Sequence, residues 1–424
     1  MVSKYGTPLY IVDEATLHSK VNELQDAYSK YKGDAKIVYS VKANFNPSIL
    51  RSFMKDNIIF DITSLGELYF LKRCDFNPAN VIYTSVTEEE KEYFEVLQSG
   101  VTRIVVSSFS GMTNLIRVAA KIGVKPKTLI RINPEVGVKA EVRASYRNGK
   151  FGVPFNAGTI ENASKIVKHI FFNEFLEFDC FHFHLGSQIT DFSCFLNTFS
   201  KLDSFISKLK KDIPSFTVNT IDIGGGTPVS YDRSVPTPEQ MTNEYVERLN
   251  QLSDTHGKFQ LMIESGRFLV AEAAILVSKI VNTKEYNGHR IVIVDAGYHV
   301  LLDSALLKQE YPQEILNLSL INETSKLDEN TEFSGIPQKN IHIVGRLCDT
   351  YDVFPLSRLS NLNNAKVGNY VSFYNVGAYS IVFNMPFYCQ TKPAIVMKTS
   401  EGDYKVIRKG TSYKDLFEEE GGSL

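Results

Sequence analysis

The sequence predicts an α/β protein, a closed (β/α)8 TIM-like barrel with a second, mostly β C-terminal domain. Short apolar runs rich in Val, Ile and Phe alternate with helical patterns up to about residue 266, as in parallel sheets joined by crossover helices. Closely spaced strand patterns without long helices then follow. The 424 residues also exceed the ~250–300 residues of a single core. We therefore expect two domains.

The candidate barrel strands are eight apolar runs, at 36–43, 58–64, 80–85, 103–108, 128–133, 178–186, 220–226 and 260–266. Helical patterns between them include 47–56, 87–99, 192–211 and 238–256. In the second helix Thr87 and Glu90 have capping-box spacing, and Gly100 ends it. Eight strands with seven helical connections favour a closed barrel over an open doubly wound sheet.

Further strand patterns indicate the β domain, at 290–296, 340–347, 369–374, 393–398 and 404–408. Residues 8–12 also resemble a strand and could join it. The predicted domains are residues 30–275 for the barrel and 1–29 plus 276–424 for the β-rich domain. The most polar loop is 322–335.

Composition narrows the class of partner and the compartment. The charges nearly cancel, with 46 Lys plus Arg against 48 Asp plus Glu, so no nucleic-acid partner is expected. Five cysteines are odd in number and lack the spacing of a zinc site or disulfide framework, which fits a reducing cytoplasm. No stretch approaches the ~18 apolar residues of a membrane span, and the N-terminus has no apolar targeting segment.

Lys42 is the most informative single residue, because it is a lone cation where the buried run 36–43 ends. Desolvating an ammonium there is costly unless it has a chemical role, and lysines tuned by burial serve as Schiff-base nucleophiles. A solvated cap of the strand is the alternative interpretation.

Other predicted strand ends are also polar or rich in glycine, and barrel enzymes gather their chemistry there. The residues concerned are Asp61, Ser64, Arg131, His184, Gly186, Ser187, Gln188, Gly224 to Gly226, and Glu264 to Arg267. Together they suit one phosphorylated aromatic cofactor.

Each of these groups has a simpler alternative. The glycine triplet is either a tight turn or a cradle of backbone N–H groups for a phosphate. His182 and His184 alternate along a strand and share a face; no third ligand is apparent, so we expect no metal and take His184 as a cofactor-stacking group. Glu264 pairs either with an arginine or with a pyridine nitrogen.

The chain resembles the alanine-racemase-fold pyridoxal phosphate (PLP) decarboxylases, closest to diaminopimelate decarboxylase and related to ornithine decarboxylase. The motifs that carry the resemblance span nearly the whole chain, at 39–44, 61–67, 184–188, 222–226, 264–267, 348–352 and 377–379.

The resemblance implies a role for each matched position. Lys42 would bind the cofactor covalently, His184 would stack on its ring, and Glu264 would pair with the pyridine nitrogen. Asp61 and Arg131 would lie on the Lys42 side of the ring. The phosphate would be held by Ser187, Gly225, Gly226, Gly266, Arg267 and Tyr379.

The resemblance also implies a head-to-tail homodimer with shared active sites. Cys348, otherwise an ordinary buried cysteine, would be the acid that protonates the substrate carbon, and it would act with Asp349 on the partner's cofactor.

The substrate pocket departs from diaminopimelate decarboxylases. Where those enzymes carry an Arg and a Tyr that grip the distal group, this chain has Asp303 and Leu307, and Cys348 is followed by Asp349 instead of Glu. A cation replaced by an anion favours a cationic or otherwise different tail. Arg267, Asp303, Asp349 and Tyr379 are the expected substrate contacts.

Three functions fit the sequence. The first is an amino-acid decarboxylase similar to diaminopimelate decarboxylase with an altered pocket. The second is a decarboxylase of a carrier-tethered or conjugated amino acid in secondary metabolism. The third is a catalytically silent regulator, against which the presence of both Lys42 and Cys348 argues.

Overall fold

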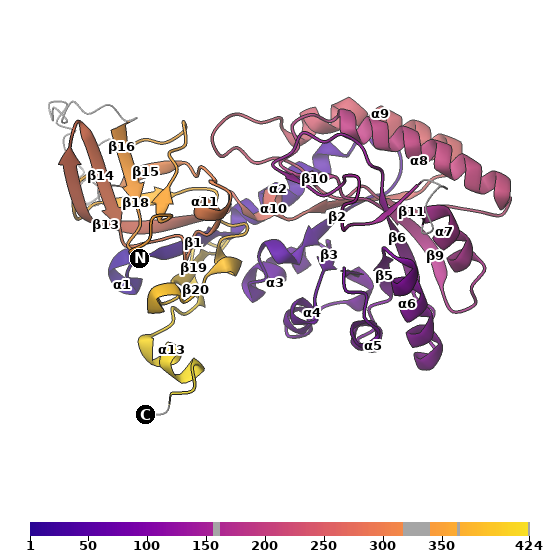
Figure 1. Cartoon of the computed structure of the whole chain (residues 1–424), viewed down its shortest axis with the longest axis horizontal. Coiled ribbons are helices and arrows are strands. Elements are labelled where there is room, and N and C mark those ends of the chain that lie inside the picture. The colour runs from indigo at the N-terminus through magenta and orange to yellow at the C-terminus, as the bar shows by residue number, and fades with distance from the viewer. Residues whose placement is uncertain (156–161, 317–339, 363–364, 423–424) are drawn as a thin grey trace. The chain divides into compact units, whose positions relative to one another are not determined.

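The structure is a computed structural model that describes residues 1–155, 162–316, 340–362 and 365–422 (Figure 1). The predicted loop 322–335 lies outside the described residues. The chain forms two compact units. The barrel unit comprises His18–Pro228 and Val235–Leu269, and the β unit comprises Met1–Leu17, Val229–Ser234 and Val270–Leu424. The limits of these units differ from the predicted domain boundaries at residues 30 and 275. The predicted boundaries stay a prediction.

The barrel unit contains the predicted closed barrel of eight parallel strands. The strand order is β5-β4-β3-β2-β12-β11-β9-β6, and pairing of β6 with β5 closes the ring. Each strand is short and almost wholly buried. The strands are β2 (Ala35–Ser40), β3 (Ile59–Ile62), β4 (Val81–Thr84), β5 (Arg103–Val106), β6 (Lys127–Asn133), β9 (Glu177–His182), β11 (Thr220–Asp222) and β12 (Gln260–Ser265).

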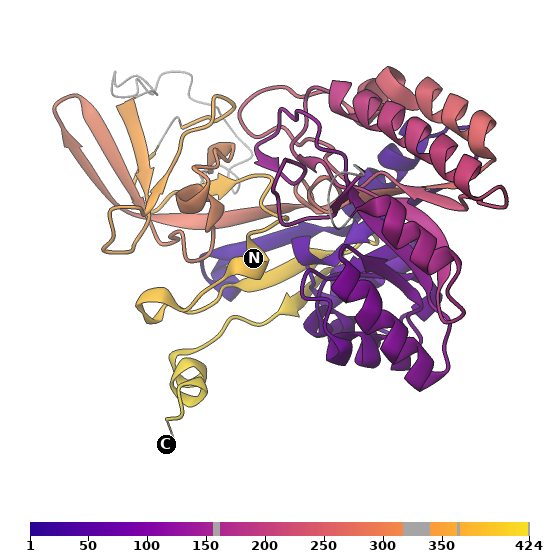
Figure 2. The same ribbon diagram turned by 45° about the vertical axis from the view of Figure 1, so that its right-hand side comes forward.

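Helices follow the strands in the order expected of β/α units. They are α2 (Glu14–Ala27), α3 (Pro47–Lys55), α4 (Leu65–Lys72), α5 (Glu90–Gln98), α6 (Phe109–Ile122), α7 (Ala163–Phe171), α8 (Ser193–Asp212), α9 (Pro238–His256) and α10 (Arg267–Val270). The two longest, α8 and α9, lie side by side (Figure 1 and Figure 2), where Asp203 pairs with Arg248 and His256.

Local capping explains where the helices begin, and it corrects one prediction. Thr237 and Gln240 form a capping box at the start of α9. The capping box predicted for α5 is wrong: Glu89 is the N-cap residue, and the Thr87 hydroxyl donates to Glu92, in the first turn of the helix. Gly100 follows α5 with φ of 86°, as expected of a residue that ends a helix.

One apolar layer fills the inside of the barrel. It takes one buried residue from each of seven strands: Val38, Ile59, Ile82, Val105, Leu129, Cys180 and Met262. Side chains alternate along a strand, so the residues two positions further on point to the same side. The apolar layer therefore supports whatever groups stand above it at the C-terminal ends of the strands.

The β unit is built on a nine-stranded sheet with the path β17-β16-β14-β13-β1-β19-β20, to which β18 and β15 are added through β13. Strand β1 (Leu9–Asp13) pairs with β13 and β19, so the expectation that it joins the β domain is confirmed. The other strands are β13 (Ala274–Tyr286), β14 (His289–Val294), β15 (Gln313–Leu316), β16 (Ile341–Val344), β17 (Val353–Phe354), β18 (Tyr370–Phe373), β19 (Ala394–Lys398) and β20 (Tyr404–Arg408).

The β unit also contains a few short helices. They are α1 (Val2–Tyr5), α11 (Asp303–Leu306) and α13 (Tyr413–Glu419). Among the described residues, no helix is both long and apolar enough to cross a membrane.

A close backbone approach in the β unit generates the first testable prediction. A Cβ at Gly377 would lie 1.7 Å from the carbonyl oxygen of Val270, whereas a Cβ at Gly137 meets nothing within 4 Å. Gly377→Ala should therefore destabilise the protein by about 1–3 kcal/mol or more, because backbone has to move. Gly137→Ala is the matched control. Thermal unfolding followed by circular dichroism measures both, and equal midpoints for the two variants would contradict the prediction.

Candidate active site

A ring of polar side chains stands one layer above the apolar core of the barrel. In each case the polar residue follows an apolar-layer residue by two positions on the same strand: Ser40 after Val38, Asp61 after Ile59, Thr84 after Ile82, Arg131 after Leu129, His182 after Cys180, and Glu264 after Met262. Asp222, at the end of β11, is in register with His182 of β9. The period of two along strands thus gathers these groups inside one rim.

Lys42 lies in a single 3-10 turn, Val41–Ala43, directly after β2. Its side chain is exposed, which corrects the expectation of a buried cation. The Lys42 ammonium nevertheless acts electrostatically on the polar ring, because it lowers the pKa values of Asp61 and Glu264 and opposes protonation of His184. The lysine and the buried carboxylates therefore belong to one electrostatic cluster.

Glu264 is a buried carboxylate held between two histidines. Its Oε1 lies 3.2 Å from Nε2 of His182, and its Oε2 lies 3.6 Å from Nδ1 of His184. Burial by itself would raise the pKa of Glu264, but His182, His184 and the Lys42 ammonium lower it below its ordinary value. Glu264 is therefore an anion. No pairing with an arginine is needed to explain its burial.

His184 follows the end of β9 and is partly exposed, whereas Ser187 lies in the two-residue strand β10 (Gly186–Ser187), which pairs with β7 (Val142–Arg143). The predicted strand 178–186 is thus two separate strands. Desolvation lowers the pKa of His184 to about 3, so its imidazole is neutral. A neutral ring at this position can lie against an aromatic ligand.

Asp61 and Arg131 are the other charged groups of the ring. Burial, with repulsion from Glu264, raises the pKa of Asp61 to about 7, and its Oδ1 has no hydrogen-bond partner in the described structure. Arg131 packs its guanidinium 4.6 Å from the ring centroid of Phe151. A buried carboxylate oxygen without a donor is the kind of atom that a bound ligand satisfies.

The glycine triplet is required by close packing rather than by turn formation alone. A Cβ at Gly224 would lie 2.3 Å from the Phe183 carbonyl oxygen, and one at Gly225 would lie 2.9 Å from that of Glu264. Gly224 and Gly226 have φ of 66° and 127°.

The amides of the triplet are only partly available to a phosphate, contrary to the simple cradle expected from the sequence. The N–H of Gly224 donates to Asp222 Oδ1 at 2.9 Å, and the N–H of Gly225 donates to Nδ1 of His184 at 3.1 Å. Arg267 is buried at the start of α10, next to the partly exposed Gly266.

In the β unit, Cys348 lies in a loop held by a buried carboxylate. Asp352 accepts from the N–H groups of Tyr298 and Leu347, both at 2.7 Å, and burial raises its pKa to about 6. The Tyr388 hydroxyl donates to the Cys348 carbonyl oxygen at 2.6 Å. Cys348 itself is exposed, so the alternative interpretation as an ordinary buried cysteine is wrong.

The remaining sequence-predicted site residues also belong to the β unit. Asp349 is partly exposed and accepts from the Tyr298 hydroxyl at 3.2 Å. Tyr379 has φ of 55° and stacks against Phe383. Asp303 is buried, 3 % exposed, at the first residue of α11. Cys348, Asp349, Tyr379 and Asp303 belong to the β unit, whereas the residues of the polar ring belong to the barrel unit.

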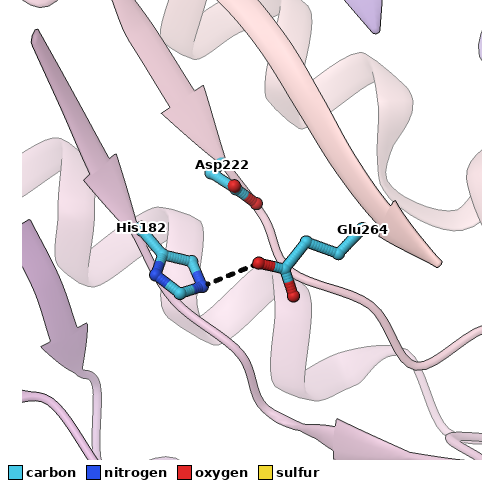
Figure 3. Close-up of side chains that lie close together, drawn as sticks. All are labelled: His182, Asp222 and Glu264. Carbon is cyan, nitrogen blue, oxygen red and sulfur yellow. Dashed lines mark ion pairs between the residues drawn. The ribbon is translucent and has the colours of Figure 1, made fainter. Parts of the chain in front are cut away.

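Sequence reasoning gave no role to Asp222 and found no third ligand beside the histidines. The structure corrects this: His182, Asp222 and Glu264 each place one ligand atom within 4.8 Å of the others (Figure 3). The signal was present in the sequence as the polar residues that end strands β9, β11 and β12. Atoms up to 4.8 Å apart do not match a preformed zinc site, whose nitrogen and oxygen ligands at ~2.0–2.2 Å lie closer together.

Comparison with known sequences places the chain beside one group of enzymes. It is 26 % identical to the diaminopimelate decarboxylase of Methanocaldococcus jannaschii over 424 residues, covering 98 % of this chain and 91 % of that protein. It is 28 % identical to the diaminopimelate decarboxylase of Aquifex aeolicus over 422 residues, covering 99 % and 92 %.

Solved structures agree with the fold. The diaminopimelate decarboxylase of M. jannaschii in complex with L-lysine matches with a TM-score of 0.85 at 25 % identity, covering 99 % of this chain and 93 % of that one. The Helicobacter pylori enzyme complexed with L-lysine matches with a TM-score of 0.84 at 24 % identity, covering 99 % and 98 %. Residues 15–271 match the family model of the pyridoxal-dependent decarboxylase, pyridoxal binding domain. Because that match covers more than half of the chain, this protein belongs to the pyridoxal-dependent decarboxylase family.

Proposed function

We propose that this PLP-dependent decarboxylase removes the α-carboxylate of an amino acid at the C-terminal end of its barrel, with Lys42 as the residue that binds the cofactor. One observation carries the proposal. A lysine, a neutral histidine and an ionised buried carboxylate share one electrostatic cluster at the strand ends. A covalent anchor, a ring-stacking group and a partner for a pyridine nitrogen are the groups that PLP requires.

The barrel residues fit this cofactor by their chemistry. Glu264 is ionised and hydrogen-bond capable, which suits a protonated pyridine nitrogen. Asp61 has a buried oxygen without a donor, and the backbone of the glycine triplet packs so closely against its neighbours that a Cβ would clash. When bound, PLP supplies an electron sink for the electrons that departing carbon dioxide leaves behind.

The chain's own side chains would position the cofactor and the substrate. His184, neutral and anchored through Nδ1 by the Gly225 N–H, would lie against the ring face. Glu264 would hold a proton on the ring nitrogen, and Asp61 and Arg131 would flank Lys42. Residues that fix the substrate carboxylate would favour decarboxylation over loss of the α-hydrogen, because they would set which bond at the α-carbon is aligned for cleavage.

The phosphate site is proposed from the residues that surround the glycine triplet. Gly226, Gly266 and Ser187 would donate to the phosphate, and Arg267 would supply positive charge. Gly225 and Tyr379 complete the proposed set. The Gly225 amide donates to His184 in this structure, so its part in phosphate binding requires that bond to be shared or exchanged.

Cys348 is proposed as the acid that returns a proton to the substrate carbon, acting in a head-to-tail homodimer on the partner's cofactor. Its exposure suits a group that reaches outward, and Asp352 fixes its loop through two backbone hydrogen bonds. Asp349 would contact the substrate tail from the same loop. We place this dimer in the cytoplasm on the basis of cysteine usage.

Two classes of amino acid are candidates for the substrate. Asp303 and Asp349 favour an amino acid with a cationic or extended neutral tail, including a conjugated or carrier-tethered one. The full-length similarity to diaminopimelate decarboxylases favours meso-diaminopimelate. These relatives are enzymes, and they lend no support to a catalytically silent regulator.

The second testable prediction concerns the cofactor anchor. Lys42→Ala should abolish decarboxylation, the visible absorbance of the bound cofactor and its borohydride-reducible link, because the covalent bond to the amine is lost. Lys36→Ala is the control: Lys36 lies on the same strand, near its N-terminal end, and pairs with Asp34. A reducible cofactor link that survives in Lys42→Ala would show that another lysine is the anchor.

The third prediction concerns shared sites. Inactive Lys42→Ala and inactive Cys348→Ala subunits, mixed in equal amounts under conditions of subunit exchange, should regain about a quarter of the native activity, since half of the dimers are hybrids and each hybrid restores one of two sites. Mixing Lys42→Ala with Glu264→Ala, both barrel variants, should restore none. Sedimentation analysis establishes the exchange. Complementation absent from the first mixture would place Cys348 outside a shared site.

The fourth prediction concerns the substrate. The unmodified enzyme should turn over meso-diaminopimelate at least tenfold less efficiently than an amino acid with a cationic tail, because a mispaired charge in a closed site costs several kcal/mol. Asp303→Arg should shift kcat/KM toward the dicarboxylate, and Asp303→Asn separates loss of the anion from gain of a cation. Efficient use of meso-diaminopimelate by the unmodified enzyme would overturn the altered pocket and leave the decarboxylase intact.

A further inference from the structure

His182 is a fully buried imidazole at the end of β9 that no step described above uses. Its side chain is 1 % exposed, and neither ring nitrogen makes a hydrogen bond of ordinary geometry. The nearest recorded acceptor is Glu264 Oε1, 3.2 Å from Nε2 (Figure 3). A buried imidazole N–H without an acceptor is destabilising. A small rotation of either side chain would turn this contact into a hydrogen bond.

The two oxygens of Glu264 face different histidines. Oε1 faces the buried His182, and Oε2 lies on the side of the partly exposed His184. Because His184 is the proposed stacking group, Oε2 is the oxygen nearer to the cofactor ring. Oε1 is therefore left to an internal partner, and His182 is the side chain that stands there.

The pKa shifts of His182, Asp222 and Glu264 support a neutral His182 that can donate a hydrogen bond. Desolvation lowers the pKa of His182, so the imidazole carries one N–H. Burial and repulsion from Glu264 raise the pKa of Asp222 well above its ordinary value, so Asp222 holds a proton more readily than an ordinary carboxyl group; its Oδ1 accepts from the Gly224 N–H. Glu264, whose pKa is lowered, is the more readily ionised of the two carboxyl groups.

We propose that His182 is a positioning residue that donates a hydrogen bond from Nε2 to Oε1 of Glu264 and thereby keeps Oε2 ionised and directed at the ring nitrogen of PLP. The inference rests on the proposed role of Glu264. It adds a residue that touches neither cofactor nor substrate and acts through the carboxylate alone.

Removing this donor has a defined chemical consequence. Burial raises the pKa of Glu264, and His182 is the largest of the influences that oppose it. Lys42, His184, Asp61, Arg131 and Asp222 also face the carboxylate and stay in place. Without His182, Glu264 gains proton affinity at the expense of the ring nitrogen. The proton then resides on the carboxyl group, and the ring becomes a weaker electron sink.

The fifth prediction tests this with three holoenzyme variants. His182→Leu removes the donor with little change in volume, and His182→Gln places an amide N–H at a similar reach. His256→Leu is the matched control, because His256 is a buried histidine whose Nε2 lies 2.7 Å from Asp203, between α8 and α9 and outside the polar ring. All three are reconstituted with PLP labelled with ¹⁵N at the pyridine nitrogen.

The expected readout is the protonation state of that nitrogen, measured by its ¹⁵N chemical shift across pH. The native enzyme and His256→Leu should show a protonated nitrogen at neutral pH, His182→Leu an unprotonated one, and His182→Gln a largely restored one. In His182→Leu, kcat should fall roughly ten- to a hundredfold, as expected for loss of one hydrogen bond to a charged group, with a smaller change in KM.

The outcomes separate this inference from the proposed function. An unprotonated nitrogen in the native enzyme would contradict the role of Glu264 itself. A protonated nitrogen in both the native enzyme and His182→Leu would overturn only the inference about His182. A stoichiometric divalent metal that is present in the purified native enzyme and lost in His182→Leu would also overturn it, because His182 would then be a ligand. If His182→Leu does not fold, the comparison of His182→Gln with His182→Asn, whose shorter amide cannot reach Glu264, decides the question.

Discussion

The closed ladder of eight parallel strands is the constraint on which the rest of the barrel unit depends. Pairing of β5 with β6 completes a ring in which every strand has two neighbours and no edge is left open. Closure fixes which face of each strand is inside. The apolar layer and the polar ring above it are then two successive inward positions on the same strands, and their separation follows from a period of two.

Several ionisable groups are buried together at the top of the closed barrel, so their charges have to be balanced. Asp61, Asp222 and Glu264 are all buried and raise one another's proton affinity, so they are not all ionised together. Lys42 and Arg131 oppose this repulsion. The outcome is unequal: His182 and His184 lower the pKa of Glu264, whereas burial and repulsion from Glu264 raise the pKa of Asp222. This difference in pKa leaves Glu264 as the carboxylate suited to pair with a cation.

The β unit uses the same physics for a different purpose. Asp352 is buried under backbone, where a Cβ at Gly345 would lie 2.2 Å from its Oδ2, and it accepts two main-chain hydrogen bonds. Both bonds hold the loop that carries Cys348, which therefore stands exposed on an ordered turn.

The sequence by itself determined the architecture and most of the barrel's chemical groups. Apolar runs and intervening helical patterns identify all eight barrel strands. Parallel strands that are buried on both faces consist of nearly continuous hydrophobic residues, which makes them recognisable in the sequence. Lys42, Asp61, Arg131, His184 and Glu264 follow from their places at strand ends. Strand β1 could be assigned to the β unit on its position alone, although its pairing with β13 and β19 could not be foreseen.

Only the tertiary structure decided how these groups interact. The partnership of His182 with Glu264 and the proximity of Asp222 depend on the register between β9, β11 and β12, which no local pattern encodes. The exposure of Lys42, the use of the Gly225 amide by His184 and the N-cap at Glu89 likewise depend on packing. Sequence periodicity specifies which face a residue takes along its own strand, whereas distances, protonation states and hydrogen-bond partners arise between strands, where closure brings distant segments together.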